Sequence, residues 1–400
     1  MTNPLSEKRI VLGVTGSIAC YKALDIASKL TQSGALVDTI LTSAANQFIS
    51  PLAFRSLTHR PVVTDLFDSE SELSINHVAL AEKADIVVVA PATANSIGKM
   101  ANGISDDPLG ATILATKSPI VVAPAMDGNM YQNPATQENI SKLVSRGIFI
   151  AGPEKGRLAS GLFGTGRLVE TPSLLGIIST VLGKDGDLKG KKIVVSAGGT
   201  QEAIDPVRTI GNRSSGKMGY SIAEAARNRG ASVTLVTAPT ALPDLAGIQI
   251  FKIENALDMK AVITSECENS DALVMAAAVS DWRPSSVLKS KAKKGDADTW
   301  SVELTRNPDI IAGVKRKGIV KVGFAAESED LVKNGISKVS SKGLDFIVAN
   351  DITKPDSGFA VDTNKVVIIH SNGTIEELPL MAKYDVGDAI LDRVKAEFES

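Results

Sequence analysis

The sequence has few cysteines, no surplus of basic charge and no long apolar run, and each of these absences excludes a class of protein. Two cysteines among 400 residues, Cys20 and Cys267, lie far apart, which leaves no disulfide framework or cysteine-based zinc site. The net charge is −2, which argues against broad nucleic-acid binding, because such binding needs a basic stripe that neutralises phosphates. Because residues 1–9 are polar and no apolar run reaches roughly 20 residues, we expect neither a signal peptide nor a membrane-spanning helix. We therefore expect a cytoplasmic protein with no nucleic-acid or membrane partner.

The chain is long enough for two domains, and its first half alternates strand and helix. Near-continuous apolar runs are typical of parallel strands that are buried on both faces. We predict such strands at residues 10–14, 37–41, 85–90 and 120–123. A helix over residues 18–32 and turns rich in proline and alanine separate them. This alternation predicts a doubly wound α/β domain.

The second half repeats this pattern after a polar, glycine-rich stretch at residues 183–192, which we interpret as a linker. The predicted domains are therefore residues 1–184 and 191–400. We predict a helix over residues 217–229, and strands at residues 193–197, 233–237, 272–277, 321–324, 345–349, 365–370 and 374–378. Asn372-Gly373 is a strong hairpin signal. The fold class is thus two doubly wound Rossmann-like α/β domains, with ligands at the carboxyl ends of the strands.

Taken singly, the polar motifs are weak evidence. The turn Gly16-Ser17-Ile18 opens a helix and could hold a phosphate, but a plain tight turn explains it equally well. Residues 211–217 fit G-x-x-x-x-G-K, yet Met218 stands where a P-loop needs Ser or Thr. A P-loop NTPase is therefore not expected, whereas a phosphate-facing loop and a solvated polar loop both stay open. His77 is a candidate base only if a site surrounds it.

Taken together, the motifs are specific because nine of them occur in order. They are GVTGSIACYK (13–22), APATAN (90–95), PAM (124–126), DPVR (205–208), NRSSGKMG (212–219), AAVSDW (277–282), NPDI (307–310), GFAAE (323–327) and AND (349–351). The set resembles the bacterial bifunctional phosphopantothenoylcysteine decarboxylase/phosphopantothenate–cysteine ligase over nearly the whole chain. The resemblance implies a coenzyme A biosynthesis flavoprotein that forms homo-oligomers.

For the second domain, the resemblance implies ligation of cysteine to 4′-phosphopantothenate with CTP and Mg²⁺, through an acyl-cytidylate. Lys291 matches the lysine that serves cytidylate formation, where its charge offsets charge on the α-phosphate. Asn212 matches the asparagine that serves turnover of the acyl-cytidylate. The positions that match CTP contacts are Met275, Ala276, Ala277, Asp281, Lys291, Pro308, Asp309, Ile310, Ile311, Phe324, Lys338 and Lys342.

For the first domain, the resemblance implies an FMN-dependent decarboxylase with a flavoprotein fold. The substrate thiol is oxidised, CO₂ is lost and the enethiol is reduced to 4′-phosphopantetheine. His77 matches the active-site histidine. The residues expected near FMN are Gly16, Ser17, Ile18, Thr42, Thr93 and Asn95.

Two positions of this domain depart from the family pattern. Asp127 replaces the asparagine that holds the substrate carboxylate, and two carboxylates in contact repel each other; Asn129 could supply the amide instead. Ser160 replaces the catalytic cysteine that donates a proton from a flap, and a hydroxyl is a far weaker acid than a thiol. Cys20 is the only thiol in this domain.

These departures leave three interpretations. The first, which we favour because the flavin loops and His77 persist, is a bifunctional enzyme with a modified flap. The second is an active ligase fused to a flavin-binding domain with weak or no decarboxylase activity. The third is a purely regulatory flavin-binding module in the first half.

Overall fold

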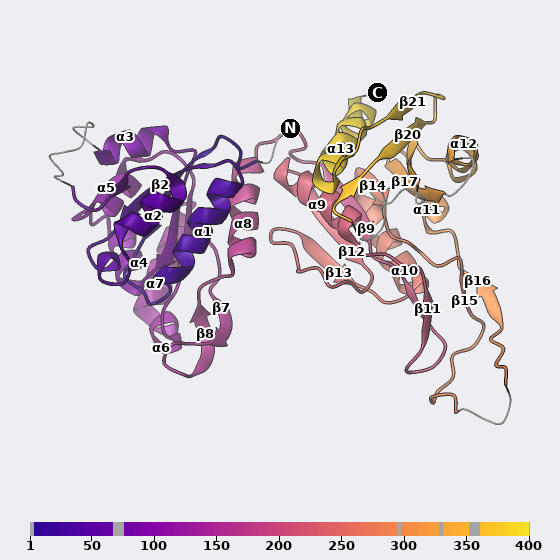
Figure 1. The fold of residues 1–400 in the computed structure, drawn as a ribbon, viewed down its shortest axis with the longest axis horizontal. Helices are drawn as coiled ribbons and strands as arrows, with labels where there is room; N and C mark the ends of the chain where they lie inside the picture. The colour runs from indigo at the N-terminus through magenta and orange to yellow at the C-terminus, as the bar shows by residue number, and fades with distance from the viewer. Residues whose placement is uncertain (1–3, 67–75, 294–297, 328–330, 352–360, 400) are drawn as a thin grey trace. The chain divides into compact units, whose positions relative to one another are not determined.

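The computed structural model describes residues 4–66, 76–293, 298–327, 331–351 and 361–399. The chain divides into two compact units, Met1–Gly183 and Lys184–Ser400. Each unit is an α/β structure built on its own sheet (Figure 1). Within the described ranges, every helix is too short or too polar to span a lipid bilayer.

Unit 1 contains a six-stranded parallel sheet in the order β3-β2-β1-β4-β5-β6. Its strands are β1 (Arg9–Val14), β2 (Leu36–Leu41), β3 (Val62–Val63), β4 (Ile86–Ala92), β5 (Ile120–Pro124) and β6 (Phe149–Ile150), followed by a hairpin of β7 (Glu154–Arg157) and β8 (Phe163–Arg167). Its helices are α1 (Cys20–Gln32), α2 (Pro51–Thr58), α3 (Asn76–Lys83), α4 (Ala94–Asn102), α5 (Pro108–Ala115), α6 (Gly128–Gln132), α7 (Pro134–Ser145) and α8 (Thr171–Gly183). The strand order reverses between β1 and β4, which is where ligands bind in open α/β sheets.

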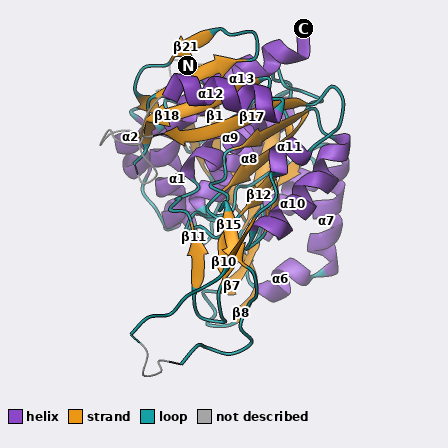
Figure 2. Cartoon of the chain, turned by 90° about the vertical axis from the view of Figure 1, so that its right-hand side faces the viewer, coloured by secondary structure: helices purple, strands orange, loops and turns teal. Residues whose placement is uncertain are grey.

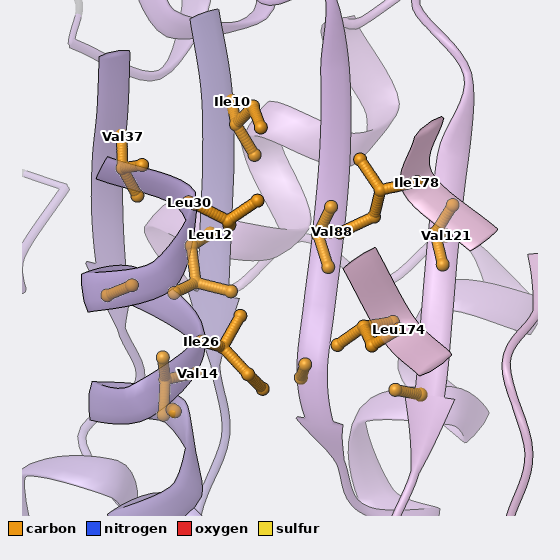
Figure 3. Packing of buried hydrophobic residues seen from close by; sticks show 14 of the residues in the cluster. Ile10, Leu12, Val14, Ile26, Leu30, Val37, Val88, Val121, Leu174 and Ile178 are labelled. Atoms are coloured by element: carbon orange, nitrogen blue, oxygen red, sulfur yellow. The ribbon is translucent and has the colours of Figure 1, made fainter. Parts of the chain in front are cut away.

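Both faces of this sheet are buried, as the apolar runs predict. Ile10, Leu12 and Val14 of β1 face α1 and α8, whereas Val11 faces the opposite layer. Figure 3 shows the first of these layers, where side chains of α1 and α8 pack on the sheet. Helices α4, α5 and α7 cover the other face. The alternation follows from the two-residue period of a strand.

Unit 2 contains an eight-stranded sheet in the order β13-β12-β9-β14-β17-β18-β20-β21. Its strands are β9 (Lys192–Ala197), β12 (Ser232–Thr237), β13 (Gln249–Lys252), β14 (Ala272–Met275), β17 (Val320–Glu327), β18 (Phe346–Asp351), β20 (Val366–His370) and β21 (Ile375–Glu377). Short ribbons add β10 (Gln201–Ala203), β11 (Thr209–Gly211), β15 (Trp282–Pro284), β16 (Leu304–Arg306), β19 (Thr363–Asn364) and β22 (Met381–Ala382). Its helices are α9 (Lys217–Asn228), α10 (Ala256–Glu266), α11 (Ile310–Gly313), α12 (Leu331–Lys342) and α13 (Lys383–Glu399).

The sheet of unit 2 is parallel up to β18, and β20 and β21 complete it as an antiparallel hairpin. The predicted Asn372-Gly373 turn joins these two strands, with Gly373 at φ +89°. Helices α9 and α13 cover one face, and α10, α11 and α12 cover the other. Figure 2 shows strands, helices and the long loops in separate colours. The prediction of two doubly wound α/β folds is therefore confirmed.

Five predicted boundaries are wrong by two or three residues. Three of them are strand ends: β4, β17 and β18 end at residues 92, 327 and 351 instead of the predicted 90, 324 and 349. The other two have a visible cause. Helix α1 begins at Cys20 rather than Ile18, because Ser17 ends the turn by accepting the N–H groups of Ala19 and Cys20. Strand β14 ends at Met275 rather than Ala277. The N–H of Ala277 is taken by the Ser196 hydroxyl instead of a neighbouring strand.

Candidate functional site

The residues expected near the flavin come together at one edge of the unit 1 sheet. They follow β1, β2 and β4, which are adjacent and parallel, so their carboxyl ends meet at the same edge. Hydrogen bonds join the loops: the Thr15 hydroxyl donates to the Pro91 carbonyl at 2.8 Å and accepts from the Thr93 N–H at 3.0 Å. Thr42 joins β2 to β1 by donating its N–H to the Val14 carbonyl at 3.1 Å.

The turn before α1 has the form of a phosphate site. A Cβ on Gly16 would lie 2.5 Å from the Cβ of Ala44, so only glycine allows the two loops to approach this closely. Ser17 follows as a small hydroxyl residue, and the 13-residue helix α1 starts behind it. The positive end of a helix suits a phosphate monoester, and a glycine lets the backbone approach a ligand closely. The residues present therefore fit the phosphate of a flavin mononucleotide.

Cys20 does not replace the missing flap thiol. Its side chain is buried, and Sγ donates to the Thr15 carbonyl at 3.1 Å. Burial raises the pKa of the Cys20 thiol, which makes the thiolate scarce at neutral pH. The contact holds the turn before α1 in place, so we assign Cys20 a structural role.

The two residues that depart from the family pattern contact each other. Ser160, in the loop between β7 and β8, donates its hydroxyl to Asp127 Oδ2 at 2.7 Å. Asp127 caps α6 by accepting the Asn129 N–H at 3.0 Å through its other oxygen. The Ser160 bond, helped by Asn129, holds the pKa of Asp127 below its usual range. The hairpin is also fixed at its base, where the Met126 N–H donates to the Gly166 carbonyl at 3.0 Å.

His77 lies in the first turn of α3, directly after the segment 67–75, which is outside the described residues. Its ring is half-buried. Its role at the flavin edge stays a prediction, as does that of Asn129, whose side chain is exposed on α6.

Unit 2 has a cavity of about 830 Å³ at the carboxyl edge of its sheet. The strand order reverses between β9 and β14, and the cavity lies beside β14 and β17 at this reversal. Most residues on its wall belong to NRSSGKMG, AAVSDW, NPDI, GFAAE and AND, five of the motifs that are far apart in the sequence. The sheet topology thus assembles the site.

The cavity wall contains all but one of the residues predicted for the ligase. These are Asn212, Met275, Ala276, Ala277, Asp281, Pro308, Asp309, Ile310, Ile311, Phe324, Lys338 and Lys342. Lys291 is the exception, because it is exposed on the long loop that links β15 to β16 and is not on the wall. Figure 1 shows the described parts of this loop extending from the β15–β16 ribbon. The catalytic role of Lys291 stays a prediction.

Hydrogen bonds hold the loops of the wall together. The Asn212 amide donates to the Val279 carbonyl at 3.0 Å, and the Asn307 amide donates to the Ser280 carbonyl at 2.8 Å. Gly199 lies beneath this junction, where a Cβ would come within 2.3 Å of the Asn212 carbonyl oxygen. Asp309 caps α11 and pairs with Lys342 of α12 at 2.9 Å. These contacts join the motif loops of the wall to one another.

Cations outnumber acids on this wall, which suits an anionic ligand. Several wall residues were not predicted as site residues: Arg306, Asn307, Asn350, Asn364 and Lys383. Asn307 and Asn350 belong to quoted motifs and could have been inferred from them. Asn364 and Lys383 belong to none, and only folding brings them to the cavity.

Comparison with known proteins assigns each unit to a family. Residues 1–183 match the Flavoprotein family, and residues 188–398 match the DNA/pantothenate metabolism flavoprotein C-terminal domain. The coenzyme A biosynthesis bifunctional protein CoaBC of Bacillus subtilis is 43% identical over 397 residues, 98% of each chain. The Escherichia coli K12 protein of the same name is 38% identical over 400 residues, 99% of this chain and 98% of its own.

Solved structures match the units one at a time. The C-terminal domain of a CoaBC protein is 36% identical and covers 53% of this chain and 97% of its own, with a TM-score of 0.45. A PPC decarboxylase variant in complex with pantothenoylaminoethenethiol is 31% identical and covers 43% of this chain and 96% of its own, with a TM-score of 0.40.

The full-length relatives confirm the resemblance that the motifs predicted. They also confirm the predicted enzyme, which combines a ligase with a decarboxylase, and give no support to the alternative of a weak or silent decarboxylase domain. The chain belongs to the family of bifunctional coenzyme A biosynthesis proteins.

Proposed function

We propose that unit 2 joins cysteine to 4′-phosphopantothenate with CTP, and that unit 1 decarboxylates the product with FMN to give 4′-phosphopantetheine. One observation carries the proposal: five separate motifs meet on the wall of one cationic cavity at the reversal of the unit 2 sheet. The proposed enzyme acts in the cytoplasm as a homo-oligomer.

In the ligase step, the substrate carboxylate attacks the α-phosphate of CTP, and pyrophosphate leaves. The acyl-cytidylate that forms is then attacked by the cysteine amine, which loses a proton as CMP leaves. Asn212 donates one of its two amide hydrogens to the Val279 carbonyl. The second can donate to the carbonyl oxygen of the acyl-cytidylate, which gains negative charge when the amine attacks. Lys291 would offset charge on the α-phosphate, and its loop would have to approach the cavity together with the DPVR loop, to which Ala292 is hydrogen-bonded.

Magnesium is expected to enter on the phosphates of CTP. Within the described residues, no group of three or more His, Cys, Asp or Glu side chains is placed to hold a metal ion. A protein cage for the ion is therefore not part of the proposal.

In the decarboxylation step, bound FMN would supply a hydride acceptor and later return the hydride to the substrate. Gly16, Ser17 and the start of α1 would hold its phosphate. Asn129, one residue into α6, would offer a neutral amide to the substrate carboxylate. Ser160 and Asp127 would hold the β7–β8 hairpin beside the same edge.

The test is a paired assay on one preparation of the full chain. With phosphopantothenate, cysteine, CTP and Mg²⁺, we expect pyrophosphate release and, with FMN, CO₂ release. Lys291→Ala should abolish pyrophosphate release, whereas Lys289→Ala, an exposed lysine on the same loop, should leave it unchanged. A wild-type protein that consumes no CTP would overturn the ligase assignment, and undiminished release by Lys291→Ala would show that another lysine acts.

A further inference from the structure

Arg283 lies beside the unit 2 cavity but is not one of the residues on its wall. It is the middle residue of β15, and its side chain is half-buried. Its Nη1 donates to the side-chain oxygen of Asn307 at 3.0 Å and to the Arg306 carbonyl at 2.6 Å. Both acceptors are neutral, and a charged donor makes a stronger hydrogen bond to them than a neutral donor would.

Asn307 is on the wall, and Arg283 fixes the orientation of its amide. The amide nitrogen of Asn307 donates to the Ser280 carbonyl at 2.8 Å, and the backbone N–H donates to the Asp281 carbonyl at 2.8 Å. A guanidinium can only donate and a carbonyl can only accept. The amide therefore has one orientation that satisfies both neighbours, and reversing it would break two hydrogen bonds.

The Ser280 side of this junction is anchored in the core. Ser280 is 5% exposed, and its N–H donates to the hydroxyl of the fully buried Thr200 at 2.9 Å. Its own hydroxyl donates to the Trp282 carbonyl at 2.8 Å. One side of the junction is thus fixed, and Asn307 attaches the NPDI loop to it.

Predicted CTP contacts lie on both sides of the junction. Asp281 is next to Ser280 in the AAVSDW loop, and Asp309 follows Asn307 by two residues in the NPDI loop. The spacing of the two loops therefore depends on the Asn307 amide, whose orientation depends in turn on Arg283. Displacements of about 1 Å are enough to weaken the contacts of a bound ligand.

We propose that Arg283 is a positioning residue for nucleotide binding, which acts through Asn307 without touching the ligand. The inference rests on the proposed ligase function and extends it, because it adds a residue from outside the cavity wall. The substrate that it affects is CTP, since the predicted contacts on both loops are contacts to CTP.

The test is steady-state pyrophosphate release by full-length Arg283→Met, in which a side chain of similar length has no donor. We expect the KM for CTP to rise by about tenfold, because a charge-assisted hydrogen bond is lost. The kcat should change less than this KM. The KM values for 4′-phosphopantothenate and cysteine should match the wild type, and a general loss of folded structure would not spare them.

A second variant tests the route through Asn307. Asn307→Ser removes the amide and should raise the KM for CTP at least as much as Arg283→Met. In the Asn307→Ser background, Arg283→Met should add little, because the bond between the two side chains is already lost. Multiplying effects would show that Arg283 acts by another route, and would overturn the proposal.

The matched control is Arg393→Met, which removes another half-buried guanidinium. Arg393 pairs with Glu376 at 2.6 Å and is not on the cavity wall, so its loss should leave the KM for CTP unchanged, whatever it does to the Tm. An unchanged KM for CTP in Arg283→Met would overturn the proposal, and so would an equal rise in all three KM values. A wild-type protein that consumes no CTP would instead overturn the proposed function itself.

Discussion

Ser160 stands at the position where related sequences are expected to carry a proton-donating cysteine, and its own proton is already engaged. The hydroxyl donates to Asp127 Oδ2 at 2.7 Å, and the bond holds the pKa of Asp127 below its usual range. A hydroxyl bonded to a carboxylate gives up its proton less readily than a free one. Ser160 therefore fits the role of a positioning residue that holds the hairpin to α6.

Because the two side chains share one hydrogen bond, we predict that their substitutions do not add. Ser160→Ala and Asp127→Asn should each slow CO₂ release from phosphopantothenoylcysteine. The double variant should be no slower than the worse single one, since the second change removes a bond already lost. The check is CO₂ release by the four proteins, with CTP-dependent pyrophosphate release as the control that should not change. Independent, multiplying effects would contradict the assigned bond.

The Ser160–Asp127 hydrogen bond also predicts how the hairpin contact depends on pH. A carboxyl group whose pKa is lowered by folding stabilises the folded state at any pH above its unfolded pKa. That contribution to stability is lost as the pH falls through the folded-state pKa. We therefore expect the hairpin contact to persist at neutral pH and to weaken only in acid.

At the scale of elements, the DPVR loop fixes the loop that carries Lys291. Asp205 is buried, and its carboxylate accepts the Ala292 N–H at 3.1 Å and Arg208 Nη1 at 2.7 Å. Burial alone would raise the pKa of Asp205, but the backbone donors of Val207, Ala292 and Arg208 keep it below its usual value. Arg208 also donates to the Ala292 carbonyl at 3.3 Å. The backbone beside Lys291 is thus held from both sides.

We predict that Asp205→Asn lowers the kcat of CTP-dependent ligation by about tenfold to a hundredfold, with a smaller effect on the KM for CTP. An amide offers one acceptor where the carboxylate serves several donors, and a displacement of about 1 Å at a reacting group can cost this much. Pyrophosphate release measures the effect. Asp244→Asn, which disturbs only a surface pair with Lys252, is the matched control. An unchanged kcat in Asp205→Asn would show that this loop is positioned by other contacts.

How far the sequence predicts these elements depends on burial. The central strands of both sheets were predictable because fully buried runs such as residues 87–89 contain only apolar residues. The edge strands β3, β6 and β13 are only partly buried and were not predicted. The strands of the two-stranded ribbons could not be predicted in this way, because strands such as β15 are partly exposed and contain no buried apolar run. Motifs predicted most of the cavity wall, whereas no motif predicted Lys383. It reaches the wall beside a pairing of β19 with β22 that only the folded chain reveals.

At the scale of the whole molecule, each unit has its own hydrophobic core. One pair of buried clusters lies within residues 5–181 and the other within residues 188–394. Each proposed ligand site is built from the residues of one unit. The two chemistries should therefore be separable in the full chain, so that Lys291→Ala still decarboxylates phosphopantothenoylcysteine that is supplied to it.

We predict that scanning calorimetry of the full chain resolves two transitions, each raised by one ligand. A ligand at a hundredfold excess over its Kd stabilises its unit by about 2.7 kcal/mol, which for units of this size corresponds to roughly 5–10 °C in Tm. FMN should raise one transition and CTP with Mg²⁺ the other, because each ligand stabilises only the core to which its loops belong. A single transition raised equally by both ligands would show that the two cores unfold as one.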